Sequence, residues 1–78
     1  MEFRQLLDIL EDLHPEVNFD EEDKLIDNKI LTSFDIVSII AEVNNEYDIT
    51  IPAGKIVPEN FNSAKALFDM IKSIEDED

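Results

Sequence analysis

Residues 31–37 read Leu31-Thr32-Ser33-Phe34-Asp35-Ile36-Val37, and this stretch carries the clearest structural signal in the chain. A hydroxyl residue followed three positions later by an acid is typical of a helix start, because each side chain can bond the other's backbone N–H. The pattern predicts a helix that opens here and runs to about Tyr47. Its broad apolar face comprises Ile36, Ile39, Ile40, Val43 and Tyr47.

Upstream of this helix, apolar residues at helical spacing predict another amphipathic helix from about Glu2 to Leu13, ending before Pro15. Residues 14–31 show no clear periodicity, and connections of this length are uncommon in compact domains. We expect an ordered loop because apolar anchors recur along it: Val17, Phe19, Leu25, Ile26, Ile30 and Leu31.

Downstream, residues 49–51 alternate apolar and polar, but no second strand is present to pair with them. We therefore expect an extended connector that ends at Pro52, then a turn or short helix over 52–56, with Pro58 as an interruption. A last helix, capped by Asn62 or Ser63, is predicted from Ala64, Leu67, Phe68, Ile71 and Ile74.

The expected architecture is therefore all-α, a four-helix bundle with three main helices, one short helix and a long loop between helices 1 and 2. Residues 1–78 form a single domain in this interpretation. The acidic residues 75–78 should fray, because acids at a helix C-terminus oppose the helix dipole.

The charge balance limits the classes of function. The chain has six Lys and Arg and 20 Asp and Glu, which gives a net charge of −14. Its hydrophobic content of 44% argues against disorder. This balance argues against binding to nucleic acid or to anionic membranes and predicts a monomer that attracts basic partner surfaces. No apolar run is long enough for membrane insertion and no signal-peptide layout is present, so we expect a cytoplasmic protein.

Enzyme chemistry has little support. The chain has no cysteine and one glycine, Gly54, which excludes thiolate sites and glycine-rich phosphate loops. The single histidine, His14, could serve as a base for Ser33 or Ser38, although we expect a plain surface residue. The acidic run 20–23 fails the EF-hand spacing, so no metal site is predicted and a solvated charge run is favoured over loose cation binding.

Ser33 is the most informative residue. At a helix N-terminus, free N–H groups and the positive end of the dipole favour an attached phosphate. The alternative is that Thr32 or Ser33 merely caps the helix. Beside it, Phe34, Val37 and Ala41 form a second apolar stripe, which either packs under the long loop or serves as a docking patch for partners.

A second stretch, Glu46-Tyr47-Asp48-Ile49-Thr50-Ile51-Pro52, identifies a family when taken with residues 31–37. Together they resemble acyl carrier proteins and their peptidyl- and D-alanyl-carrier relatives. The first stretch is similar to the family's Asp-Ser-Leu attachment motif and the second to its Glu-Phe-Asp-Ile-x-Ile-Pro segment, at a matching separation. Phe61-Asn62-Ser63 and the helix that follows also resemble the family's ending, so the resemblance covers nearly the whole chain.

The resemblance implies a bundle of acyl-carrier type and a non-catalytic protein. In that family a phosphopantetheinyl transferase attaches 4′-phosphopantetheine covalently to the serine, here Ser33. The arm then carries an acyl or aminoacyl thioester between enzymes, as in fatty-acid, polyketide or D-alanyl metabolism. The implied contacts with basic docking surfaces of these partners are Thr32, Phe34, Asp35, Val37, Ala41, Glu42, Glu46 and Ile56.

The attachment motif and the helix that follows it both depart from the family pattern. Thr32 stands where the family usually has Asp, which puts recognition by some transferases in doubt, and Phe34 stands for the usual Leu, as in D-alanyl carriers. Ser38, Asn44 and Asn45 stand where fatty-acid-synthesis carriers often place acids. We therefore expect a specialised carrier with its own partners rather than the general fatty-acid carrier. The alternative from another class is an acidic helical adaptor or inhibitor that binds a basic partner and uses Ser33 only as a cap.

Overall fold

The computed structural model describes residues 2–77 and begins with α1 (Phe3–Leu13), which forms where leucines recur at helical spacing. Its buried face carries Leu6, Leu7 and Leu10. At its start, the N–H of Glu2 donates to the side chain of Gln5 (2.7 Å). The helix ends at Leu13, and His14 follows it as the C-cap, as expected of a residue that precedes proline.

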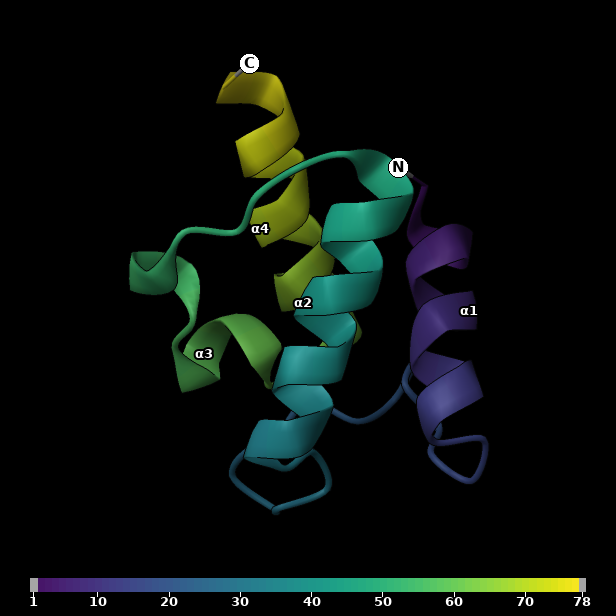
Figure 1. Cartoon of the computed structure of the whole chain (residues 1–78). Coiled ribbons are helices and arrows are strands. Elements are labelled where there is room, and N and C mark those ends of the chain that lie inside the picture. The colour runs from purple at the N-terminus through teal and green to yellow at the C-terminus, as the bar shows by residue number, and fades with distance from the viewer. Residues whose placement is uncertain (1, 78) are drawn as a thin grey trace.

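α2 (Ser33–Tyr47) packs beside α1 and runs in the opposite direction, so the end of α1 and the start of α2 lie at the same end of the molecule (Figure 1). Ile39 and Val43 are fully buried on its inner face. The helix ends at Tyr47, and the following residue, Asp48, adopts the left-handed backbone conformation (φ 53°) that commonly closes helices. The helix predicted from residue 32 to about Tyr47 is thereby confirmed.

The segment after α2 is extended, as predicted, and it buries Ile49 and Ile51. A short 3₁₀ turn, η1 (Ala53–Lys55), follows, and then α3 (Pro58–Phe61). The expectation that Pro58 only interrupts the chain was wrong, because this proline begins α3. At the first position of a helix its missing N–H costs nothing and its fixed φ suits the helix.

α4 (Ala64–Glu77) is capped by Ser63, whose hydroxyl oxygen accepts the N–H of Ala66 at 3.0 Å. Of the two caps left open by the sequence, the serine takes this role and Asn62 has another. The helix extends to Glu77, while Asp78, part of the tail expected to fray, lies outside the described residues. Fraying of residues 75–78 stays a prediction.

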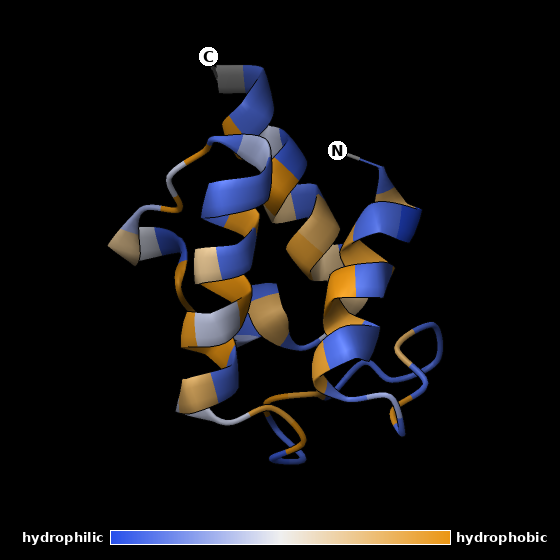
Figure 2. Cartoon of the chain, turned by 45° about the vertical axis from the view of Figure 1, so that its right-hand side comes forward, coloured by the Kyte–Doolittle hydropathy of each residue, from blue (hydrophilic) through white to orange (hydrophobic). Residues whose placement is uncertain are grey.

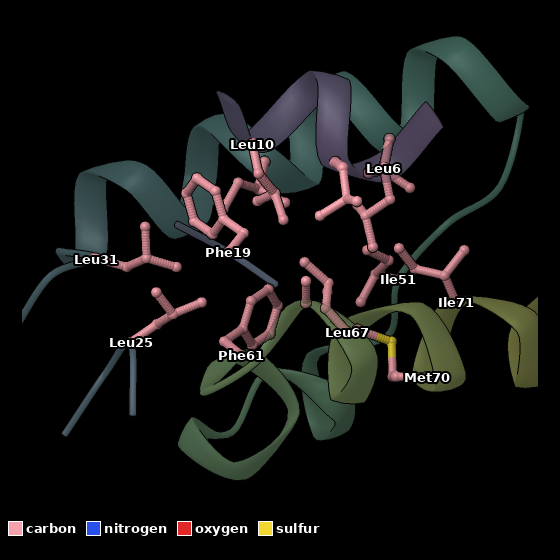
Figure 3. Packing of buried hydrophobic residues seen from close by; sticks show 14 of the residues in the cluster. Leu6, Leu10, Phe19, Leu25, Leu31, Ile51, Phe61, Leu67, Met70 and Ile71 are labelled. Atoms are coloured by element: carbon pink, nitrogen blue, oxygen red, sulfur yellow. The ribbon is translucent and has the colours of Figure 1, made fainter. Parts of the chain in front are cut away.

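The loop 14–31 is ordered through its apolar anchors. Phe19, Leu25 and Leu31 are 3%, 0% and 4% exposed, and Figure 3 shows their side chains pointing into the same core as those of Leu10 and Phe61. Val17, Ile26 and Ile30 pack partly against that core. The interpretation of this segment as an anchored loop is confirmed.

Across residues 2–77 the structure has four α-helices, one 3₁₀ turn and no strand, which confirms the all-α bundle. Hydrophilic and hydrophobic bands alternate along the long helices, as required of helices with one buried face (Figure 2). The radius of gyration is 11.4 Å, close to the roughly 11.5 Å of a compact domain of this length. None of the described helices has the length and hydrophobicity to cross a bilayer.

Candidate functional site

Ser33 is the first residue of α2, and its side chain is exposed. The preceding residue performs the capping: Thr32 Oγ1 accepts the N–H of Asp35 (3.3 Å), and Asp35 Oδ2 accepts the N–H of Thr32 (2.9 Å). The Ser33 hydroxyl makes no hydrogen bond to any part of the chain that the structure describes. Thr32 therefore caps the helix, and the exposed Ser33 hydroxyl is not used for capping.

The first turn of α2 also contacts the end of α1. His14 Nε2 lies 3.0 Å from Asp35 Oδ2, an ion-pair distance without the alignment of a hydrogen bond, and His14 Nδ1 lies 3.1 Å from Glu16 Oε2. The histidine side chain is only 23% exposed. His14 was expected to be a plain surface residue, and this expectation was wrong, because the fold brings α1 and α2 together at this point.

The two partners shift each other's protonation. The pKa of His14 is raised, chiefly by the Asp35 carboxylate and further by Glu16, while partial burial opposes the shift. Partial burial acts to raise the pKa of Asp35, but the Thr32 N–H and His14 outweigh it, so this pKa is lowered. Both shifts favour the charged pair beside the start of α2.

The apolar stripe on α2 is open to solvent. Phe34 is 78% and Val37 65% exposed, and Ala41 is also exposed. The interpretation that the long loop covers this stripe was therefore wrong. Ile56, which lies directly after η1 and not on α2, is 40% exposed. The structure thus leaves large apolar side chains uncovered on the same helix turns that follow Ser33.

Glu42 and Glu46 lie one turn apart on α2, and both are exposed. They line a shallow depression of about 300 Å³ together with Asp8 and Asp12 from α1. The acidic surface is therefore shared between the two helices. The contribution of α1 was not predicted from the sequence, although the four-residue spacing of its two aspartates was a signal that both share one helix face.

The acidic run 20–23 borders an open groove of about 640 Å³ between α1 and α4, whose aromatic lining is Phe3, Phe19 and Phe68. Ser33 does not line this groove. Within residues 2–77, no three His, Asp or Glu side chains converge as metal ligands would.

The chain is a small helical bundle with an exposed serine at the start of its second helix. Two curated proteins of Bradyrhizobium diazoefficiens are similar to it. Aminoacyl carrier protein 1 is 46% identical over 41 residues, which cover 53% of this chain and 46% of that protein. Aminoacyl carrier protein 2 is 38% identical over 60 residues, which cover 77% of this chain and 60% of that protein.

The matched stretches thus span about half of these relatives' length, and neither a protein-family model nor a solved structure matches the chain. The identities show that the chain is similar to aminoacyl carrier proteins, and the all-helical fold agrees with a bundle of acyl-carrier type. Both relatives are named as carrier proteins, which agrees with the carrier role expected from the sequence.

Proposed function

We propose that the protein is a carrier whose Ser33 bears a covalent 4′-phosphopantetheine arm. The observation that carries this proposal lies at the start of α2. Thr32 caps the helix, and within the described residues the Ser33 hydroxyl remains exposed and makes no hydrogen bond. The similarity to two proteins named aminoacyl carrier protein supports the same role.

In the proposed attachment reaction, Ser33 Oγ attacks the β-phosphorus of coenzyme A. The new Oγ–P bond replaces the bond from that phosphorus to the bridging oxygen, adenosine 3′,5′-bisphosphate leaves, and a base of the transferase takes the hydroxyl proton. The residues fit the group, because the N-terminus of α2 favours a negatively charged phosphodiester. Asp35 holds its carboxylate toward Thr32 and His14, so its charge is partly compensated.

When bound, the arm supplies a terminal thiol that holds the cargo as a thioester. The chain itself has no cysteine, so no neighbouring thiol can capture that cargo. The names of the two relatives support an aminoacyl group as the cargo class. The role of this chain is then to present the arm and to dock with the enzymes that load and unload it.

Docking would use the exposed face of α2. Phe34 and Val37 supply apolar contact beside the serine, and Glu42 and Glu46 supply negative charge farther along the same helix. With 20 acidic against six basic residues, the fitting partner surface is basic with an apolar centre. Thr32, Asp35, Ala41 and Ile56 complete the proposed contact set. The proposed carrier is a monomeric, cytoplasmic protein.

The test is the intact mass of the protein before and after incubation with coenzyme A and a broad-specificity phosphopantetheinyl transferase. We expect a gain of one phosphopantetheine unit, lost in Ser33→Ala and kept in Ser73→Ala, a change of an exposed serine on α4. Because Thr32 departs from the family pattern, a second transferase belongs in the experiment. A folded sample that neither arrives modified nor gains the unit with either transferase would refute the carrier and favour the acidic adaptor.

A further inference from the structure

The contact between His14 and Asp35 joins two helix ends of opposite polarity. His14 follows the last residue of α1, and its N–H still donates to the carbonyl of Leu10 (3.0 Å). Asp35 lies in the first turn of α2. A cationic imidazolium suits the partly negative C-terminus of a helix, and a carboxylate suits the partly positive N-terminus. The charged pair therefore stabilises both helix ends, in addition to the attraction between its own two charges.

Asp35 transmits this contact to the start of α2. The same Oδ2 atom that lies 3.0 Å from His14 Nε2 accepts the N–H of Thr32 at 2.9 Å and its hydroxyl at 3.1 Å. Thr32 directly precedes Ser33. A change in the position or charge of Asp35 therefore changes the cap that fixes where the serine stands.

The ionic attraction between His14 and Asp35 depends on the proton of the imidazolium, whose pKa is raised above its ordinary value. Its charged neighbours are Glu16 from the following loop and Asp35 from α2, which are the two groups that act on it within the described part of the chain. Both are carboxylates, so the imidazolium is stabilised from two sides. A neutral imidazole can still lie against Asp35, but without the ionic attraction.

We propose that His14 is a positioning residue that, in its protonated form, holds Asp35 and thereby fixes the Thr32–Ser33 start of α2 against the end of α1. Its functional meaning rests on the proposed attachment at Ser33. The contribution is complete below about pH 6.5, the ordinary histidine value, and is lost as the pH rises through the raised pKa of the folded state. The serine is then presented in a proton-dependent manner.

The first experiment is an NMR titration of the unmodified protein from about pH 5 to pH 9, following the His14 ring and the amides of Thr32, Ser33 and Asp35. We expect the ring to titrate above 6.5 and the three amides to shift with the same midpoint. In His14→Gln this amide transition should disappear. His14 is the single histidine of the chain. An amide transition that disappears in His14→Gln is therefore caused by this side chain and not by the terminal amine.

Two further variants keep the test decisive even where His14→Gln folds poorly. Asp35→Asn should move the His14 pKa toward its ordinary value and abolish the amide transition. Glu16→Gln is the matched control: it should lower the His14 pKa but leave the amides of Thr32 and Ser33 titrating with the ring. Amides that titrate unchanged in His14→Gln or Asp35→Asn would overturn the inference.

The functional readout is the rate of phosphopantetheine transfer to Ser33 in wild type divided by that in His14→Gln. This ratio should change about two- to fivefold across the His14 midpoint, the size expected of a charge at a helix end. His14→Lys has a permanent charge, so the rate of transfer in this variant divided by that in His14→Gln should not change across the His14 midpoint. A wild-type ratio that does not depend on pH would overturn the link between the protonation of His14 and the position of Ser33. If Ser33 accepts no arm at all, the proposed function fails, while the NMR titration still decides the role of His14.

Discussion

Asn62 and Ile26, 36 positions apart in the chain, are joined by a hydrogen bond in which the Ile26 N–H donates to Asn62 Oδ1 at 2.9 Å. The same oxygen accepts the N–H of Asp27 at 3.1 Å, and the backbone carbonyl of Asn62 accepts the N–H of Leu25 at 2.8 Å. One residue between α3 and α4 therefore satisfies three consecutive N–H groups of the long loop. This loop leads directly to the serine at the start of α2.

Asn62→Ala should lower the free energy of unfolding by about 1–3 kcal/mol, because two loop N–H groups lose their acceptor while the bond to Leu25 remains. Amide exchange at Ile26 and Asp27 should accelerate. Urea unfolding and hydrogen exchange measure the two effects. Asn45→Ala, at an exposed position on α2, is the control and should stay within about 0.5 kcal/mol. Equal effects of the two variants would mean that Asn62 does not hold the loop.

The parts of the fold that the sequence predicted correctly are those set by local patterns. The start of α2 depends on Thr32 and Asp35, which are three residues apart and bond to each other's backbone. The ordered loop was predicted because apolar residues such as Phe19 and Leu25 must be buried somewhere in a small domain. The first inference needs only the short spacing between two residues, and the second needs only the hydrophobicity of single residues.

The parts that were missed depend on polar contacts between distant segments. Asn62 has the sequence signal of a helix cap, and nothing near it shows that its side chain binds residues 26 and 27. His14 contacts Asp35 because α1 and α2 are antiparallel neighbours, a relation that no local pattern encodes. In the candidate site, the exposure of Phe34 could be suspected from the helix face, but deciding whether the loop covers it required the structure.

Phe34 and Phe61 provide a matched test of which aromatic residues stabilise the fold. Phe61 is 1% and Phe34 78% exposed. Phe61→Ala should lower the free energy of unfolding by about 3–5 kcal/mol because it leaves a cavity in the core. Phe34→Ala removes the same atoms from solvent and should change it by no more than about 0.5 kcal/mol.

Urea unfolding measures both variants, and Phe61→Leu serves where the alanine variant does not fold. Under the proposed function, Phe34→Ala should also slow transfer to Ser33 while stability is kept. A large loss of stability in Phe34→Ala would show that the side chain is packed, which would contradict its assignment as a docking residue.

The stabilising effect of Asp35 should be greatest in a window of pH bounded by its own titration and by that of His14. The pKa of Asp35 is lowered from 3.8, so its contribution is present above about pH 3.8 and is lost as the pH falls through the folded value. The pKa of His14 is raised above 6.5, so its contribution is complete below that pH and is lost as the pH rises through the folded value.

The measurement is the free energy of unfolding of wild type minus that of Asp35→Asn from about pH 3 to pH 9. Taking this difference cancels much of the change in repulsion among the other acidic residues of a chain with net charge −14. We expect a maximum between the two titrations and a decline on each side. Glu42→Gln, which changes an exposed carboxylate on the same helix, should show no such maximum. A difference that persists unchanged at alkaline pH would mean that Asp35 stabilises α2 through the Thr32 cap alone, without His14.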